Sequence, residues 1–440
     1  MREGGAWSLT SIALRGAKAS RASMYCWRTL IPASFLVYSF SYLDRLNFGY
    51  GAAAGMGDDL GISPSQLSLV GSLTFLGYFL CQVPAALLAR RIGGKNAISI
   101  AMFLWGPLSA ATGLISNINV LYIDRFFLGC VESAVLPALF ILSTHWFSAV
   151  ERGKAMSIII MGGPVTLAMM SVISAFLASK VGWRGMFILE GLPPIFLVWI
   201  WMAVIVDTPR RASRMISDSY TKLDALLCDE QNIIEEKANA PTARLALKTA
   251  FLGCLYFWWS LAAYGFTIWS PTLLRNGGMT LIEVGWLSAL LYVLVICLKL
   301  LCSYYSDRWR TRIPFLWPFF VLSVIACFVW GVIGSADGWR SQLLFLAAGI
   351  GANAPAGIFF AFIADLIPRR ISGGSFAFIN GMGALGSFMG SYIIGIATGA
   401  SAYVDAPYLM LTVTSLITLM LCAALPYCKP APDQDRAALE

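Results

Sequence analysis

The sequence predicts an all-α membrane protein with twelve transmembrane helices arranged in two six-helix halves. The chain has 440 residues, of which 58% are hydrophobic and only 12% are charged, whereas a soluble domain carries roughly 25% charged residues. Apolar runs recur between Ile31 and Leu425, and each is long enough to cross a hydrocarbon core of about 30 Å. A single long polar segment at 207–247 divides these runs into two sets of six.

The pattern of runs gives the spans and the domain boundaries. The expected spans lie near 30–52, 66–89, 97–116, 119–147, 155–179, 186–206, 248–270, 284–304, 314–334, 342–366, 374–398 and 406–427. The expected regions are an N-terminal tail at 1–28, a first half at 29–206, a linker at 207–247, a second half at 248–428 and a C-terminal tail at 429–440.

The basic residues predict that both termini and the linker are cytoplasmic. With the N-terminus inside, the outer loops contain Lys180, Arg184, Arg275 and Arg340. The spans contain Arg45, Arg125 and Lys299, and the other 24 of the 31 lysine and arginine residues lie in inner loops and tails. Such a bias is typical of cytoplasmic loops. The net charge of +8 therefore indicates loops beside lipid headgroups and not a nucleic-acid surface.

The cysteine and histidine content indicates neither an enzyme nor a metal centre. Ten cysteines are scattered without a CxxC pair, and His145 is the single histidine. Neither a disulfide framework nor a zinc site is therefore expected. The sequence also has no nucleophile–base pair and no cofactor motif. We expect a chain that is not an enzyme and that binds no cofactor.

Two corresponding loops indicate that the halves are repeats. "ALLARRIGGK" follows the second span and "SYYSDRWRTR" follows the eighth, and each is a helix end followed by a short basic loop. Arg90 and Asp307 occupy equivalent places in these loops. Many secondary transporters consist of repeated halves with a substrate site near the membrane midplane between them.

Several motifs, in order along nearly the whole chain, resemble those of the major facilitator superfamily and, within it, the anion:cation symporter family. They are "YLDRLNFG", "FLGYFLCQVP", "DRFFLGCVESAVLPA", "WFSAVERGKA", "GWRGMFILEGLP", "DTPRRA", "SDRWRTR" and "INGMGALGSFMGSYIIG". Spans 1, 2 and 11 are most similar to the sugar-acid branch, which includes rhamnonate, galactonate and hexuronate carriers. The resemblance implies the fold of that superfamily and a gating role for Asp307 and Arg308.

Two positions depart from the family pattern. Arg90 stands where the superfamily usually has an aspartate after span 2, so one gating interaction is weakened. In span 11 many relatives carry a second asparagine, where this chain has Ala384 after Gly383. Asn380 is kept, and we expect it to point inward toward the substrate.

Span 4 carries two charges on one helical face. Arg125 and Glu132 are seven residues apart. This spacing is nearly two helical turns, so both side chains lie on one face about 10 Å apart along the axis. Gly129 lies between them and allows a ligand or a neighbouring helix to approach closely.

The charges of span 1 point in two directions. Asp44 and Arg45 are adjacent, so their side chains leave the helix about 100° apart. Tyr42 shares the face of Arg45, whereas Asp44 is directed to a neighbouring helix or to the pocket wall. Each charge at the centre of a membrane helix costs about 2.5–3.5 kcal/mol on an insertion scale, and such residues are usually functional.

These four charges predict an anion site with coupled protons. An arginine offers a planar fork that matches a carboxylate, so Arg45 and Arg125 are expected to hold the substrate carboxylate. Asp44 and Glu132 are expected to bind the proton, because a carboxyl group in a low-dielectric site stays neutral unless it is paired. The resemblance implies the same roles. Internal salt bridges between spans 1 and 4 are the structural alternative.

Five further residues are predicted to line the substrate site, namely Tyr78, Gln82, Tyr264, Trp269 and Asn380. Tyr78 and Gln82 could hydrogen-bond substrate hydroxyls, or they could pack against span 11. Tyr264 and Trp269 could stack on the substrate, although an interfacial anchor is equally consistent with Trp269. Lys299 is expected to extend to the headgroups, and Asp365 and Glu190 are expected to cap helices or latch loops.

The sequence thus predicts a proton-coupled symporter that imports an organic anion by alternating access. A sugar acid such as an aldonate or hexuronate is the first choice of substrate. The alternatives are an aromatic carboxylate such as phthalate, a dicarboxylate such as tartrate, and a membrane sensor of a sugar derivative. We expect a monomer in the bacterial inner membrane, with a small carboxylate, protons and lipid as its partners.

Overall fold

The described residues of the first half fold into helices joined by short connections. The structure is a computed structural model, and it describes residues 25–209, 243–309, 311–333, 338–366, 372–399 and 405–428. The helices of the first half are η1 Cys26–Leu30, α3 Ile31–Ala53, α4 Met56–Leu60, α5 Pro64–Ile92, α6 Gly94–Thr112, α7 Ile118–Glu132, α8 Val135–Trp146, α9 Ala149–Ile160 and α10 Gly162–Val204.

The second half repeats this arrangement. Its helices are α13 Ala243–Asn276, α14 Leu281–Arg308, α15 Ile313–Ile333, α16 Gly338–Asn353, α17 Ala356–Leu366, α18 Ser372–Gly399, α19 Ala406–Ala423 and η2 Leu425–Cys428. The described residues contain no strand. Equivalent helices begin in the same way: Ser63 with Gln66 starts α5 with a capping box, and Thr280 with Glu283 starts α14 with another.

The predicted spans correspond to these helices. Within the described residues, nine helical stretches are long and apolar enough to cross a membrane. One of them, 151–204, contains two predicted spans, and Gly182 separates these by turning the backbone to a φ of 73°. The helices α3 and α6 coincide with the predicted spans at 30–52 and 97–116, although they are not among the nine.

Two predicted spans are broken where the sequence analysis expected continuous helices. Span 119–147 divides into α7 and α8 at Ser133 and Ala134, and span 342–366 divides into α16 and α17 just before Ala356. A proline explains each break. Pro137 has no N–H for the carbonyl of Ser133, and Pro355 likewise interrupts the hydrogen-bond ladder of its helix.

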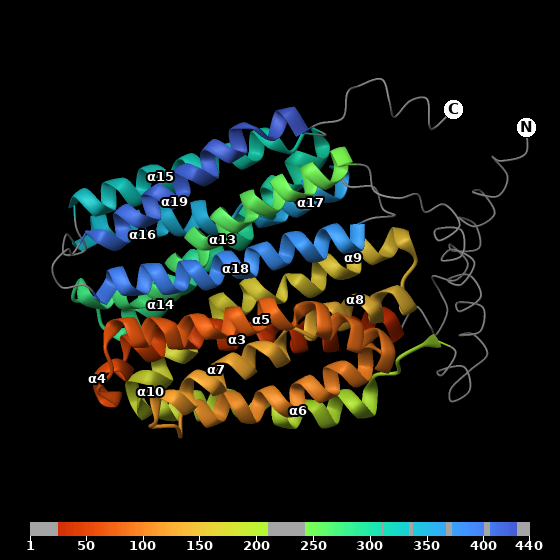
Figure 1. The fold of residues 1–440 in the computed structure, drawn as a ribbon, viewed down its shortest axis with the longest axis horizontal. Coiled ribbons are helices and arrows are strands. Elements are labelled where there is room, and N and C mark those ends of the chain that lie inside the picture. Colours follow the sequence, from red (N-terminus) through yellow and green to blue (C-terminus); the bar gives the residue numbers. More distant parts are fainter. Residues whose placement is uncertain are drawn as a thin grey trace, which may run out of the picture.

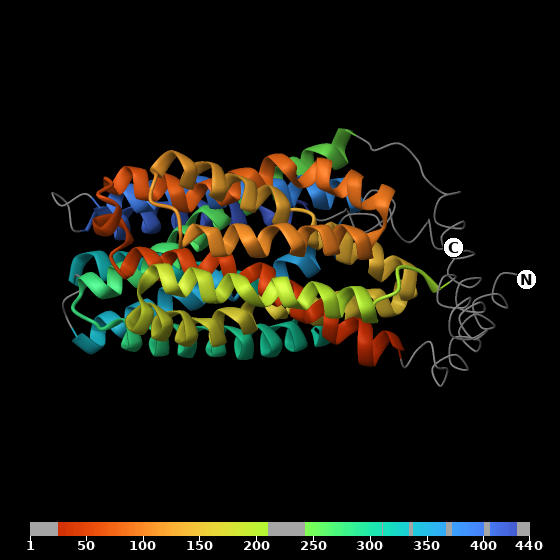
Figure 2. The same cartoon turned by 90° about the horizontal axis from the view of Figure 1, so that it is seen from below.

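The helices run roughly side by side along the long axis of the molecule (Figures 1 and 2). The helices α3 to α10 form one half and α13 to α19 the other. Across the boundary α5 packs on α18, α10 on α14, and α3 on α13. Each half has an apolar core of its own, around Trp105 and Trp201 in the first and Trp259 and Phe320 in the second. A third cluster crosses the boundary.

Close contacts between the halves gather toward the end that carries α4, which the charge distribution predicts to be the outer end. Gly49 faces the carbonyl of Ile268, and Gly399 faces Pro64. A Cβ at Gly285 of α14 would lie 2.6 Å from the Cβ of Ala175 in α10. Because glycine has no side chain, these backbones approach closely, and the two halves are held together at this end.

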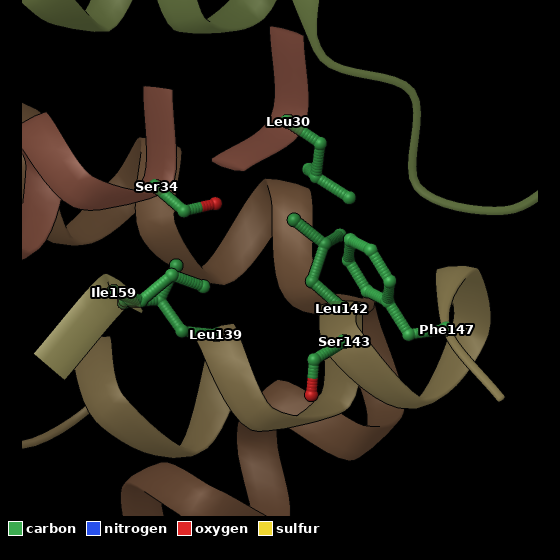
Figure 3. A pocket seen from close by; sticks show the side chains of 7 residues that line it. All are labelled: Leu30, Ser34, Leu139, Leu142, Ser143, Phe147 and Ile159. Carbon is green, nitrogen blue, oxygen red and sulfur yellow. The ribbon is translucent and has the colours of Figure 1, made fainter. Parts of the chain in front are cut away.

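A small pocket lies away from that boundary, between α3, α8 and α9 (Figure 3). Its lining is Leu30, Ser34, Leu139, Leu142, Ser143, Phe147 and Ile159. The lining has no charged group that could bind a carboxylate. This pocket is therefore not a candidate substrate site.

The glycine contacts give a test of the fold. Gly285→Ala places a methyl group against α10, and overpacking of this kind costs about 1–3 kcal/mol. We expect a lower unfolding temperature for the purified protein in detergent. Gly153→Ala in α9 is the matched control, because a Cβ there meets nothing within 4 Å and alanine favours a helix. Equal unfolding temperatures for the two variants would contradict the tight contact.

Candidate functional site

Arg45 lies at the centre of the candidate site, on α3 at the boundary with the second half. Its side chain is 17% exposed, and its Nε lies 3.9 Å from Oε2 of Glu132. The guanidinium carbon lies 5.0 Å from the ring centre of Tyr42 and 4.7 Å from that of Tyr78. Aromatic faces attract a cation at this range, so the two rings hold the guanidinium without using its N–H donors.

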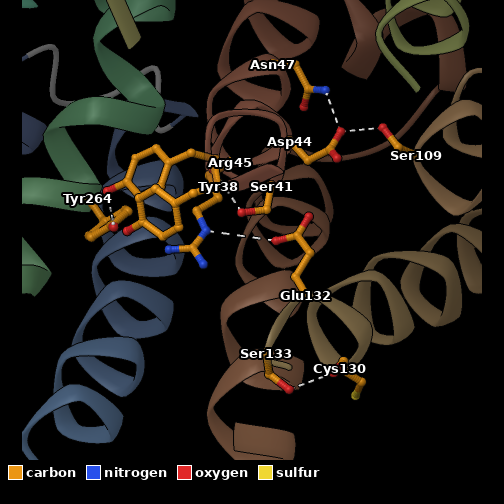
Figure 4. A network of polar contacts seen from close by, with 11 residues as sticks. Tyr38, Ser41, Asp44, Arg45, Asn47, Ser109, Cys130, Glu132, Ser133 and Tyr264 are labelled. Carbon is orange, nitrogen blue, oxygen red and sulfur yellow. Dashed lines mark hydrogen bonds and ion pairs between the residues drawn. The ribbon is translucent and has the colours of Figure 1, made fainter. Parts of the chain in front are cut away.

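Glu132 is the buried partner of this arginine. It is the last residue of α7, and its side chain is fully buried. Neither carboxyl oxygen accepts a hydrogen bond within the described part of the chain. The contact with Arg45 is therefore a loose ion pair, drawn as a dashed line in Figure 4. Removing the counter-charge of a buried carboxylate is strongly unfavourable, so the state of Glu132 depends on Arg45.

Tyrosine side chains form the wall beside Arg45. The hydroxyl oxygens of Tyr42 on α3 and Tyr264 on α13 are 2.7 Å apart, which joins the two halves by a neutral hydrogen bond. The rings of Tyr38 and Tyr42 pack at 5.8 Å in a tilted arrangement, and Phe75 of α5 meets the ring of Tyr264 at 5.1 Å. The site thus combines one partly exposed cation with several phenol groups.

Arg125 has different surroundings from Arg45. It is 1% exposed, and its guanidinium carbon lies 4.7 Å from the ring centre of Phe187 and 5.5 Å from that of Phe48. None of its three side-chain nitrogens has a hydrogen-bond partner among the described residues. The sequence analysis expected both arginines to face one carboxylate. In this conformation Arg45 is partly exposed beside tyrosines, whereas Arg125 is enclosed by phenylalanines.

Asp44 is directed away from Arg45, as its neighbouring position on α3 predicts. It is 3% exposed. Its Oδ1 accepts a hydrogen bond from Nδ2 of Asn47 at 3.0 Å and a second one from the hydroxyl of Ser109 on α6 (Figure 4). Arg125 and Asp124 are the charged groups of α7 that act on it. Asp44 therefore belongs to a buried polar network behind Arg45.

Two of the remaining predicted site residues, Tyr78 and Gln82, lie on α5 near Arg45. Tyr78 contacts Arg45, and Gln82 lies one turn later with a buried Oε1 that has no partner among the described residues. A Cβ on Gly381 of α18 would lie 3.7 Å from that oxygen, so Gln82 is close to the half-buried Asn380 region.

Trp269 instead packs between helices. It is 2% exposed, and its indole N–H donates to the carbonyl of Ser391 at 2.6 Å. In this conformation its ring is not open for stacking on a substrate, and it is not at an exposed interface, because Phe48 of α3 and Ser391 of α18 lie against it.

The predicted gating residues have an unexpected partner. Asp307, at the end of α14, forms an ion pair with Arg312 rather than with Arg308, which is exposed. Arg312 also pairs with Asp365 of α17 at 2.9 Å. Asp365 therefore fixes a loop as predicted: its ion pair joins α17 to the connection between α14 and α15, within the second half. In the first half, Oδ1 of Asp207 accepts a hydrogen bond from the backbone N–H of Lys95 at 2.9 Å, just beyond the last turn of α5, which carries Arg90.

Glu190 was expected at a helix end, and this expectation is wrong. It lies eight residues beyond the Gly182 break, inside the second arm of α10, and is 3% exposed. Its carboxyl group accepts a hydrogen bond from Ser174 at 2.6 Å. The predicted span at 186–206 already contained this residue, and an acidic residue within an apolar run was a signal for a buried group. Asn47, one turn after Asp44, was also missed.

No metal site accompanies these groups. Across the described ranges, no set of three histidine, cysteine, aspartate or glutamate side chains is placed to hold a metal ion.

Comparisons with known proteins match almost the whole chain. The sequence profile described as "Major Facilitator Superfamily" matches residues 34–391 and, separately, 250–438. A "Quinolone resistance transporter" of Acinetobacter baumannii is 27% identical and covers 89% of this chain and 92% of its own length. A "Putative tartrate transporter" of Agrobacterium vitis is 27% identical over 92% of this chain and 96% of its own length.

A solved structure shares the fold. It is a bacterial homologue of the human lysosomal transporter Spinster in an inward-facing, unoccupied conformation, with a TM-score of 0.73 and 16% identity over 94% of this chain and all of its own. The profile covers most of the chain, and the relatives are named as transporters. The protein is therefore a multi-pass membrane transporter, not an enzyme, and belongs to the Major Facilitator Superfamily.

Proposed function

We propose that the protein imports a carboxylate, most readily a sugar acid, together with protons by alternating access. The observation that carries this proposal is Arg45, a partly exposed arginine between the halves whose only described counter-charge is the loosely placed Glu132. A guanidinium held by ring faces keeps its N–H donors for a carboxylate. An organic anion as substrate also agrees with the tartrate transporter named among the relatives.

The coupling to protons follows from competition for Arg45. When a substrate carboxylate binds Arg45, Glu132 loses its positively charged partner. Glu132 is fully buried, and an unpaired buried carboxylate is costly, so it binds a proton. Asp44 is the second acid, held by Asn47 and Ser109. Release of the anion restores the pair and releases the proton.

The phenol groups favour a hydroxylated substrate. Tyr42, Tyr78 and Tyr264 lie around the partly exposed cation of Arg45, and Gln82 has an unsatisfied buried oxygen among the described residues. Hydroxyl groups on the substrate could satisfy such atoms. A dicarboxylate such as tartrate is the second candidate, favoured by the relative. The enclosure of Arg125 disfavours a second carboxylate, because that guanidinium is not open in this conformation.

Arg45→Lys tests the anion site. Lysine keeps the charge but loses the planar fork, and a hydrogen bond to a charged group contributes about 1.5–3 kcal/mol. We expect uptake of an aldonate into proteoliposomes to fall about 10- to 100-fold at equal protein content. Arg340→Lys, a basic residue outside the site, is the control and should transport normally. Normal uptake by Arg45→Lys would remove this residue from the site.

Competition tests the substrate class. Aldonates and hexuronates should inhibit uptake more strongly than their deoxy analogues, because each buried polar group left unpaired costs about 1–3 kcal/mol. Benzoate and phthalate, which lack aliphatic hydroxyls, should compete weakly. The measurement is the concentration that halves uptake of a labelled aldonate. Phthalate or tartrate competing as strongly as aldonates would replace the sugar-acid assignment by one of the alternatives.

Glu132→Gln and Asp44→Asn test proton coupling. Each amide resembles the protonated acid, so each variant should bind substrate and exchange it across the membrane, yet fail to accumulate it against a gradient. Counterflow and proton-driven uptake in the same vesicles separate the two activities. If the carboxyl groups only fasten α3 to α7, exchange and accumulation will be lost together. Accumulation by Glu132→Gln at the parent level would exclude this residue from coupling.

A further inference from the structure

Lys299 of α14 is a cation within a membrane span that the proposed anion site does not use. It lies nine residues before the end of α14 at Arg308, which is about 13.5 Å of helix. It is half-buried, and no ion pair or hydrogen bond joins it to another described residue. No charged group of the described residues acts on it. Charged residues in membrane spans are rare, and they usually mark the path of a substrate or an ion.

The protein-facing side of α14 carries Lys299. Ser288, Tyr292 and Val295 are buried, and they precede Lys299 by eleven, seven and four residues. At 100° per residue, all three lie within about 40° of Lys299 around the helix. The exposed apolar residues lie about 100° or more away from it, and they are Trp286, Leu290, Val293, Leu300 and Tyr304. Lys299 therefore leaves the helix toward the protein, which contradicts the expectation that it extends to the lipid headgroups.

Two contacts on either side of Lys299 show which helices this stretch of α14 faces. A Cβ on Gly349 of α16 would lie 2.4 Å from Cδ2 of Leu291, and a Cβ on Gly357 of α17 would lie 3.4 Å from Oγ of Ser303. Lys299 lies between Leu291 and Ser303 along α14. It therefore stands at the level of the break between α16 and α17.

This break adds a polar group at the same level. Asn353 is the last residue of α16 and is half-buried. Its Nδ2 donates to the carbonyl of Gly349 at 3.1 Å, which leaves one N–H and the amide oxygen for another partner. Irregular backbone at membrane depth is tolerated where it is buried in protein or lines a water-filled cavity. The break therefore fits a wall of the path between the halves.

Lys299 lies deeper than Arg45, toward the predicted inner end. Arg45 is eight residues from the outer end of α3 at Ala53, whereas Lys299 is eighteen residues from the outer end of α14 at Leu281. These separations are about 12 Å and 27 Å of helix. The close contacts between the halves gather at the outer end. An anion that leaves Arg45 in the inward direction therefore passes the level of Lys299.

We propose that Lys299 is a second binding point for the substrate carboxylate, on the inner part of the path between the halves. This inference rests on the proposed anion transport and adds a residue to it. The ammonium group supplies three N–H donors and a compact charge, and Asn353 and Ser303 supply polar groups at the same level for substrate hydroxyls. Arg45 holds the carboxylate by a planar fork, whereas Lys299 holds it as a point charge. A weaker second stop favours release, because an ion must be able to leave each site on its path.

The half-saturating substrate concentration on each face tests this assignment. In Lys299→Gln the charge is lost, so the gluconate concentration that half-saturates transport from the predicted inner face should rise about tenfold, the effect of one charge-assisted hydrogen bond. The value for the outer face should change little, because Arg45 is intact. Inside-out and right-side-out vesicles give the two values at equal protein content. An unchanged inner value would overturn the inference.

Two matched variants control for the loss of a lysine. Lys299→Arg keeps the positive charge and should behave as the parent. Lys180→Gln removes an exposed lysine at the predicted outer end and should leave both values unchanged. A tenfold rise on both faces in Lys299→Gln, or a rise of the same size in Lys299→Arg, would indicate a structural role for Lys299 and overturn the inference.

A second measurement uses the parent protein and needs no transport. Sulfosuccinimidyl acetate, an amine reagent that does not cross membranes, should acetylate Lys299 from the predicted inner face, and gluconate should reduce this labelling. Mass spectrometry locates the label. Lack of labelling from that face, or labelling that no carboxylate reduces, would overturn the inference. Protection of Lys299 by phthalate but not by gluconate would contradict only the sugar-acid proposal and would support the second binding point.

Discussion

A charge inside the hydrocarbon layer must find its counter-charge within the protein, and the pair of Arg45 and Glu132 meets this requirement between α3 and α7. Much of the surrounding structure depends on it. Tyrosine rings shield the guanidinium on two sides, and Gly129 lets α7 come close to the backbone of Thr74 on α5. With α5 so near, Tyr78 reaches the same arginine. The arrangement keeps the cation inside the bilayer without saturating its hydrogen-bond donors.

The two arginines within the spans of the first half, Arg45 and Arg125, have different surroundings. Arg45 is partly open and is balanced by one carboxylate, whereas Arg125 is closed and lies among Asp44, Asp124 and Glu132. In this conformation Arg125 therefore offsets the negative charge of the buried acids beside the site. Its aromatic neighbours Phe48 and Phe187 come from two different helices, so a relative movement of these helices would also change the exposure of Arg125.

Much of this fold could be predicted from the sequence, because apolar runs of this length report directly on the bilayer. The charges of α3 and α7 were also evident, since a charge in an apolar run is conspicuous. The partners of those charges were not. Asn47, Ser109 and Ser174 are small polar residues that occur widely in membrane helices, and only the packing of α3 on α6 and α10 shows which of them meet a carboxyl group. The breaks at Pro137 and Pro355 escaped prediction because helices in lipid often tolerate such residues.

The hydrogen bond between Tyr42 and Tyr264 has a kinetic consequence for the transport cycle. It links the two halves at the level of the site, so it must break and re-form whenever the halves separate there. A neutral hydrogen bond contributes only about 0.5–1.5 kcal/mol, which biases the population of the closed arrangement by roughly two- to tenfold. An ion pair in lipid at the same place would hold the halves far more firmly. The hydrogen bond between the two phenols thus favours the arrangement in which the halves meet at the site, yet it is weak enough for thermal motion to separate them there.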